Sequence, residues 1–237
     1  MPTRFTDRII KHLSSDSYEP EPTQAVMDDL RIDEEDRPAF LETIEELKSD
    51  NELIERKGGT LELPSFTEGE LVTGGFRKNE RGFGFLIPEK THREGDLFVP
   101  ARFTGDAMSG DTVEVRVHMD KRRAGDDRSP YTGEVVRVVG RRRTTFSGTI
   151  DKQRGEWVVV PDGKQLGPVV VVRDAEAKNA NVGDKVIVDI IHFPEGEYVA
   201  EGVISKVLGE AGEPDVETQA VIEAHGLPGD FPESCLE

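Results

Sequence analysis

The stretch Arg81-Gly82-Phe83-Gly84-Phe85-Leu86-Ile87-Pro88 decides the predicted fold of the middle of this chain. Successive side chains of a strand point to opposite faces, so Phe83 and Phe85 share one face and the two glycines share the other. A second run, Asp96-Leu97-Phe98-Val99, places Phe98 on the outer face as well. We therefore expect three phenylalanines together on the outer surface of a sheet, where burial alone gives no reason for them.

The residues around this stretch predict a pair of β-barrels. From residue 66 onward, β-branched and aromatic residues alternate between Gly and Pro, a pattern typical of short strands. The pattern occurs twice, because Arg81–Pro88 matches Arg154–Pro161 at an offset of 73 positions. Each copy offers about five strands, the number found in an OB-fold. Two tandem barrels are expected, a first one over residues 66–143 and a divergent second one over residues 144–209.

The first 64 residues predict a small helical domain that ends in a hairpin. Apolar residues recur at helical spacing in three segments, and two short strands at residues 53–56 and 60–63 flank Lys57-Gly58-Gly59. Three helices and a hairpin make the winged-helix arrangement. The predicted fold class is thus multidomain α+β, with a winged-helix-like domain followed by two five-stranded OB-fold barrels. Residues 210–237 are too few for their own core, and we expect a linker or the start of a missing catalytic domain, with a short helical pattern at Val216, Ala220, Val221 and Ala224.

The charge of the chain is unevenly distributed. The net charge is −18, which disfavours contact with phosphates. Residues 1–64 hold 8 basic and 17 acidic side chains, whereas residues 65–143 hold 15 and 13. The middle segment is therefore the expected nucleic-acid binder. Seven carboxylates on and before the third helix of the first domain would be repelled by a DNA backbone, which disfavours a DNA-reading role there.

The composition also excludes several classes of protein. The sequence contains no run of 18 apolar residues and no signal-peptide core, so contact with a membrane is not expected. A single cysteine, Cys235, fits a reducing compartment, and a cytoplasmic location is expected. The five histidines and Cys235 show no metal-ligand spacing, so no metal site is predicted in this chain.

The chemistry of the first barrel favours binding of single-stranded nucleic acid. Bases stack on aromatic rings with little sequence preference, at about 1–3 kcal/mol per base, and neighbouring cations can follow the phosphates. The loop between the fourth and fifth strands of an OB-fold commonly contacts nucleic acid. The predicted RNA-contacting residues are Phe76, Arg77, Lys78, Arg81, Phe83, Phe85 and Phe98, with Lys121, Arg122, Arg123 and Arg128 from that loop.

A role in the core is the alternative to base stacking for the aromatic residues of both barrels. The phenylalanines of the first barrel could instead form its core, with the glycines marking a bulge. In the second barrel Glu156 and Val158 replace the two phenylalanines, which makes it a poor binder, and Trp157 is expected in its core.

Both motifs resemble those of a known family. Arg81–Leu86 resembles the first ribonucleoprotein motif of cold-shock domains, and Leu97–Pro100 resembles the second, with Pro100 where that family has a stacking histidine. Phe76 lies roughly where the family carries a tryptophan. The order of domains resembles the N-terminal region of bacterial ribonuclease R, a member of the ribonuclease II family of processive 3′-to-5′ exoribonucleases.

This resemblance implies that the chain captures single-stranded RNA and feeds it to a catalytic domain, in cis or in trans. The family's aspartate cluster, which holds divalent metal, does not occur in this sequence. No catalytic residue and no cofactor are therefore expected within residues 1–237, and these residues alone are expected to be inactive. A self-standing cold-shock-like RNA chaperone is the alternative. A winged-helix DNA-binding regulator is disfavoured by the acidic first domain.

Overall fold

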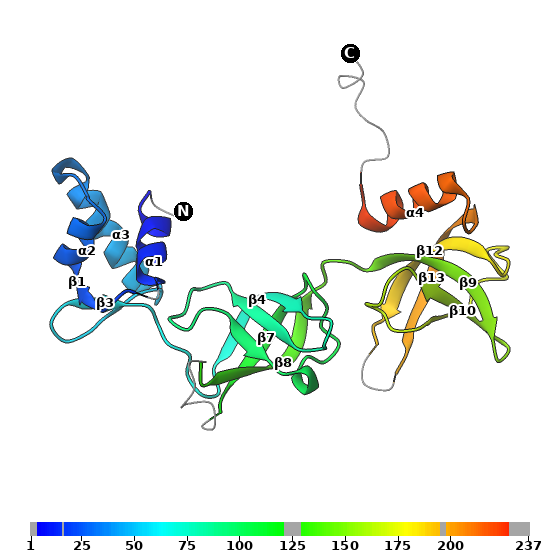
Figure 1. Cartoon of the computed structure of the whole chain (residues 1–237), viewed down its shortest axis with the longest axis horizontal. Coiled ribbons are helices and arrows are strands. Elements are labelled where there is room, and N and C mark those ends of the chain that lie inside the picture. Colours follow the sequence, from blue (N-terminus) through cyan, green and yellow to red (C-terminus); the bar gives the residue numbers. More distant parts are fainter. Residues whose placement is uncertain (1–3, 16, 121–128, 195–197, 228–237) are drawn as a thin grey trace, which may run out of the picture. The chain divides into compact units, whose positions relative to one another are not determined.

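The computed structural model describes residues 4–15, 17–120, 129–194 and 198–227, which form one mixed α/β domain and two β-domains (Figure 1). The chain divides into two units, Met1–Gly140 and Arg141–Glu237. None of the helices in these described ranges combines the length and apolar character that crossing a bilayer requires.

The N-terminal domain contains the predicted helices and hairpin and one further strand. Its elements are α1 (Thr6–Leu13), β1 (Glu21–Pro22), α2 (Thr23–Asp29), η1 (Glu34–Asp36), α3 (Arg37–Ser49), β2 (Ile54–Glu55) and β3 (Thr60–Glu62). The strands pair antiparallel in the order β1-β3-β2. Phe5, Ile9, Phe40 and Leu61 are almost fully buried between the helices and the sheet. Strand β1 was not predicted, because two residues carry no periodic signal.

The first barrel consists of five antiparallel strands. They are β4 (Leu71–Lys78), β5 (Gly84–Pro88), β6 (Leu97–Val99), β7 (Thr112–Met119) and β8 (Tyr131–Gly140), with a short helix η2 (Ala101–Phe103) after β6. The sheet order is β6-β5-β4-β7-β8. Residues that alternate along these strands fill the core, among them Phe76, Leu86, Leu97, Val99 and Val113.

The inner face of β5 depends on a glycine. A Cβ atom at Gly84 would lie 2.3 Å from the Cζ atom of Phe76 and 3.0 Å from the carbonyl oxygen of Arg77. Phe76 is 2% exposed, so its ring cannot move aside into solvent. By contrast, a Cβ atom at Gly75 on the outer face of β4 would meet no heavy atom within 4 Å.

We predict that Gly84→Ala destabilises the first barrel by about 1–3 kcal/mol, because the added methyl overpacks the core. Gly75→Ala, the matched control, should change the free energy of unfolding by no more than about 0.5 kcal/mol. Denaturant unfolding of the two variants measures the difference. Equal effects would show that the contact between Gly84 and Phe76 does not constrain the barrel.

The second barrel repeats the strand order of the first. Its strands are β9 (Thr145–Gln153), β10 (Glu156–Pro161), β11 (Val170–Val172), β12 (Asp184–His192) and β13 (Ala200–Glu210). The barrel is closed in the order β10-β11-β13-β12-β9, with β11 parallel to β13. Strand β11 begins 73 positions after β6, the same offset that relates the two sequence copies. The predicted repeat of five strands is confirmed.

Trp157 is less buried than its predicted place in the core of the second barrel requires. The side chain is half-buried, and its Nε1–H donates to Glu176 Oε1 at 3.3 Å. The Nζ atom of Lys152, its partner on β9, lies 4.7 Å from the ring centroid. Trp157 is only the second residue of β10, so it lies at the end of the strand pair and is not enclosed by the barrel.

Residues 214–225 form a helix, as the apolar spacing within residues 210–237 indicated. Helix α4 (Pro214–His225) packs against β9, β12 and β13 through its buried residues Val216, Ala220 and Ala224 (Figure 1). The Lys185 side chain of β12 is only 6% exposed, and its Nζ atom lies 2.8 Å from Glu217 Oε2 on α4. Nζ also lies 3.0 Å from Asp162 Oδ1. The helix is therefore part of the second barrel's folded unit.

The ion pair of α4 predicts a pH-dependent contribution to stability. Hydrogen bonds from Lys185 and from the Gly212 N–H lower the pKa of Glu217. A lowered pKa means that the ionised carboxylate stabilises the fold above the usual Glu range, and that this contribution is lost as the pH falls through the lowered pKa. Glu217→Gln should therefore lower the unfolding midpoint at pH 7, and the difference from the wild type should shrink below about pH 4.

Urea unfolding at a series of pH values tests this expectation. In a Lys185→Met background the same Glu217→Gln change should have little further effect, because the partner charge is already gone. If the unfolding midpoints of the wild type and of Glu217→Gln differ by the same amount down to low pH, the ionised Glu217 carboxylate is not the source of the stabilisation.

Candidate nucleic-acid interface

Three phenylalanines lie together on the outer face of the first barrel, as their alternation predicted. The centroids of the Phe83 and Phe98 rings are 5.6 Å apart, those of Phe85 and Phe98 are 5.7 Å apart, and those of Phe83 and Phe85 are 5.9 Å apart. Phe85 pairs directly with Phe98 across β5 and β6. All three side chains are partly exposed. The alternative that they form the core does not fit, because Leu97 and Val99 occupy the core face of β6.

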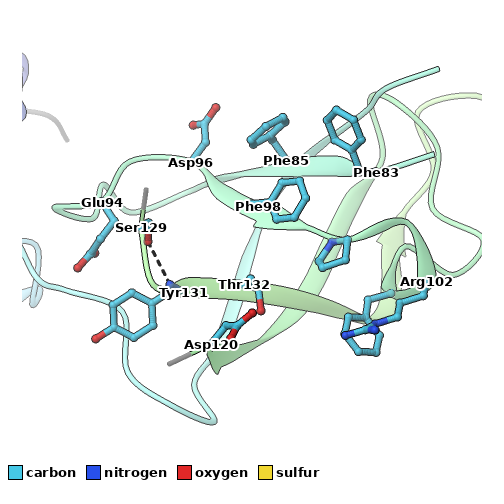
Figure 2. Close-up of a pocket in the computed structure, with 12 residues that line it drawn as sticks. Phe83, Phe85, Glu94, Asp96, Phe98, Arg102, Asp120, Ser129, Tyr131 and Thr132 are labelled. Atoms are coloured by element: carbon cyan, nitrogen blue, oxygen red, sulfur yellow. Dashed lines mark hydrogen bonds between the residues drawn. The ribbon is translucent and has the colours of Figure 1, made fainter. Parts of the chain in front are cut away.

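The phenylalanines form one wall of an open groove of about 690 Å³. Figure 2 shows them on one side, with Tyr131 and Asp120 on the other. The remaining residues that line the groove are Glu94, Asp96, Pro100, Arg102, Phe103, Ser129 and Thr132. The guanidinium carbon of Arg102 lies 4.6 Å from the centroid of the Phe103 ring. The groove therefore offers aromatic surface on both sides.

Sequence reasoning missed Tyr131, Phe103 and Arg102. Tyr131 begins β8, far in sequence from the Phe83 motif, whereas Arg102 and Phe103 belong to η2, directly after β6. The sheet order brings Tyr131 to the groove, and η2 reaches it as the continuation of the strand that carries Phe98. An aromatic residue at the start of the fifth strand is the one local signal that could have indicated Tyr131.

Arg77 and Arg81 are both exposed, and Arg77 lies beside the aromatic wall. Arg77 pairs with Phe85 across β4 and β5, and its Nη2 atom lies 3.2 Å from Asp96 Oδ2. The Arg77 side chain is still 64% exposed, so it can also reach a phosphate. Arg81 is exposed in the turn before β5, where its backbone N–H donates to Asn79 Oδ1 at 2.9 Å.

The prediction that Phe76 contacts RNA was wrong. Phe76 lies in the core with 2% of its surface exposed, so its ring has no free face for a base. The neighbouring Arg77 points to the outer face, and strand alternation turns Phe76 inward.

Lys78 is also poorly placed for a phosphate. It is half-buried, and its Nζ atom donates to the Ala107 carbonyl oxygen at 3.1 Å. Burial lowers the pKa of Lys78. The predicted contacts Lys121, Arg122, Arg123 and Arg128 lie outside the described residues, and their role stays a prediction.

Carboxylates also line the groove. The Glu94 carboxylate accepts hydrogen bonds from the Ser65 hydroxyl and from the Phe66 backbone N–H, and Asp96 is held by Arg77. Negative charge inside the groove repels a charged phosphate far more strongly than an uncharged base. The groove is therefore suited to bases, with phosphates directed toward the arginines at its side.

The second barrel lacks the matching aromatic pair, as its sequence predicted. Glu156 is exposed and Val158 is buried where the first barrel has Phe83 and Phe85. The guanidinium carbon of Arg143 lies 4.3 Å from the centroid of the Phe146 ring of the same barrel. The Arg143 side chain thus packs against an aromatic ring of the second barrel itself.

Family models match a large part of each barrel. A model described as the Ribonuclease B OB domain matches residues 74–138, and one described as the Cold shock domain matches residues 158–232. The matched segments lie in the two barrels and α4, outside the N-terminal domain. The sequence analysis placed the cold-shock type in the first barrel, whereas the family model of that description matches the second barrel together with α4.

Similarity to individual proteins extends over most of the chain. Ribonuclease R of Acidithiobacillus ferrooxidans is 28% identical over 214 residues, which cover 89% of this chain and 46% of that protein. The chain resembles ribonuclease R over most of its length, as its motifs and domain order predicted. It spans less than half the length of this curated relative.

Two solved structures share the fold at low identity. Mycoplasma genitalium RNase R in complex with ribose methylated single-stranded RNA matches with a TM-score of 0.55 and 17% identity, over 69% of this chain and 25% of that one. Yeast Ssd1, a pseudonuclease, matches with a TM-score of 0.51 and 18% identity, over 68% and 27%.

Proposed function

We propose that this chain binds single-stranded RNA along the groove of its first barrel, as the RNA-capturing part of a cytoplasmic, ribonuclease R-like 3′-to-5′ exoribonuclease. The observation that carries the proposal is the mutual contact of Phe83, Phe85 and Phe98 on a partly exposed face. Exposed rings in contact with one another give a continuous surface on which consecutive bases can stack.

The same surface favours single strands over duplexes. Stacking on a side chain requires a base whose face is free, and bases inside a duplex already stack on their neighbours. The three phenylalanines form one continuous wall at β5 and β6, and Arg77 is the cross-strand neighbour of Phe85. An RNA strand would therefore lie with its bases toward the rings and its phosphates toward the arginines.

The N-terminal domain is proposed to be of the winged-helix type without a DNA-reading role. Three helices and a sheet in the order β1-β3-β2 support this arrangement. The exposed side of α3 carries Glu42, Glu45 and Glu46. A helix with this charge would be repelled in the major groove, so the DNA-binding alternative is disfavoured.

Hydrolysis is proposed to belong to a catalytic domain outside residues 1–237, in cis or in trans, together with any divalent metal it uses. The shared fold does not decide this point, because it occurs both in an RNase and in a protein described as a pseudonuclease. The self-standing RNA chaperone remains the second candidate, and the aromatic groove would serve either function.

We predict that Phe83→Ala and Phe98→Ala each weaken the binding of single-stranded RNA by about 1–3 kcal/mol, because each removes a stacking surface. Folding stability should fall less than in Leu97→Ala, where truncation of a fully buried side chain costs about 2–5 kcal/mol. Fluorescence anisotropy with a labelled RNA and thermal unfolding of the same variants give the two quantities. A Phe83→Ala variant that unfolds as early as Leu97→Ala, yet keeps its RNA affinity, would refute the stacking surface.

We also predict that RNA binding weakens with salt, and that Arg81→Ala lowers the slope of log K against log[salt] by about 0.7, the value for one phosphate contact on a single strand. Lys164→Ala in the second barrel is the control and should leave the slope unchanged. The length of the RNA should stay constant when the chain is incubated with Mg²⁺ or Mn²⁺. Progressive shortening that co-purifies with the protein would contradict the assignment of hydrolysis to another domain.

A further inference from the structure

Three potential metal ligands converge in the N-terminal domain, far in sequence from the RNA groove. His12 lies in the last turn of α1, Glu21 in β1, and Asp29 at the end of α2. The Nε2 atom of His12 lies 3.5 Å from Glu21 Oε1 and 3.7 Å from Asp29 Oδ2. The three ligand atoms all lie within 4.8 Å of one another.

Neighbouring groups hold two of these ligands in place. The His12 ring packs edge-on against Tyr18, with centroids 5.3 Å apart. The Tyr18 hydroxyl donates to the Leu61 carbonyl oxygen of β3 at 2.8 Å and accepts from the Glu21 N–H at 3.4 Å. The imidazole and the strand that carries Glu21 are thus fixed through one tyrosine, before any ion binds.

Pairing with acids leaves His12 only loosely held, since its one hydrogen bond to a carboxylate, that to Glu21 Oε1, is 3.5 Å long. Nε2 can carry one proton, yet it faces two carboxylate oxygens, and both distances are longer than the usual hydrogen bond of about 2.9–3.0 Å. Neither carboxylate receives a short bond from the imidazole. The two negative charges also lie in a domain where acidic side chains outnumber basic ones. A divalent cation between the three atoms would accept the lone pair of the imidazole nitrogen and neutralise the charge of both carboxylates.

We propose that His12, Glu21 and Asp29 bind a divalent metal ion, and Zn²⁺ in particular. An imidazole nitrogen suits zinc and other transition metals, whereas Mg²⁺ and Ca²⁺ prefer oxygen ligands. Tetrahedral zinc with bonds of about 2.0–2.2 Å holds its ligands roughly 3.3–3.6 Å apart. The two distances from His12 Nε2 need little change to reach this spacing.

The exposure of the ligands fits an ion that enters from solvent. The His12 and Glu21 side chains are 23% and 28% exposed, whereas Asp29 is 61% exposed. Three protein ligands leave a fourth position, which water can occupy on the open side of Asp29. Bound zinc would join the end of α1 to β1 and α2, and so stabilise the helical domain. This inference replaces the expectation that the chain has no metal site, and it does not depend on the proposed RNA groove.

Calorimetric titration of the 237-residue chain with ZnCl₂ at pH 7 tests the proposal. We expect one tightly bound ion per chain, and visible absorption typical of tetrahedral cobalt when Co²⁺ replaces zinc. His12→Gln and Asp29→Asn should each weaken zinc binding by at least about tenfold. Zinc should raise the unfolding temperature of the wild type and leave that of His12→Gln unchanged. Circular dichroism confirms that each variant is folded.

Two controls distinguish this site from other histidines and acids. Asp28→Asn changes the adjacent carboxylate, which accepts from Gln24 Nε2 at 2.9 Å and lies outside the cluster, so zinc affinity should be kept. His118→Gln removes another histidine that lies between two carboxylates, those of Glu68 and Glu134, and should also keep it. The proposal is overturned if the wild type binds no stoichiometric zinc. It is equally overturned if binding survives His12→Gln with Asp29→Asn, or is lost in His118→Gln.

Discussion

The ring of Phe76 fills the space beside Gly84 on the inner face of the first barrel. This contact fixes which face of β5 points inward. Leu86 lies on the same side of the strand as the glycine and is accordingly fully buried. With the inner face settled, Phe83 and Phe85 have to lie outside. The aromatic groove is therefore a consequence of core packing, and the register with β6 adds Phe98 to it.

Alternation along single strands was enough to predict the outer phenylalanines and the repeat of five strands. Phe76 was misassigned because it was aligned by resemblance, whereas the antiparallel pairing of β4 with β5 turns it inward. Lys78 was chosen for its charge beside the aromatic face, and its hydrogen bond to the Ala107 carbonyl oxygen could not be foreseen from the sequence. Phe103 follows Phe98 closely in sequence but was not recognised. Tyr131 could not be found from local patterns, since it reaches the groove only through the order of strands in the sheet. The His12 cluster was missed for the same reason, because its three ligands belong to three different elements.

The two barrels show how a scaffold and a binding surface can be separated. Strand order persists from one copy to the other, and β6 and β11 keep the 73-residue offset. The residues on the outer face do not persist, because Glu156 and Val158 stand where the first copy has phenylalanines. The second copy has instead gained α4 and the buried Lys185 that holds it. The packing of the barrel core therefore constrains the inward-facing residues of each copy, while the outer face of each copy can bind a different ligand or none.

Helix α4 also determines where the second barrel can be joined to other sequences. A chain cut directly after β13 would uncover the apolar surface on which Val216, Ala220 and Ala224 pack, and would remove the Glu217 partner of Lys185. Such a fragment would tend to self-associate, since exposed apolar patches drive aggregation. Gene fusions or fissions that preserve a soluble barrel should therefore have their junctions beyond residue 225, and this helix should travel with the barrel whenever the domain is shuffled.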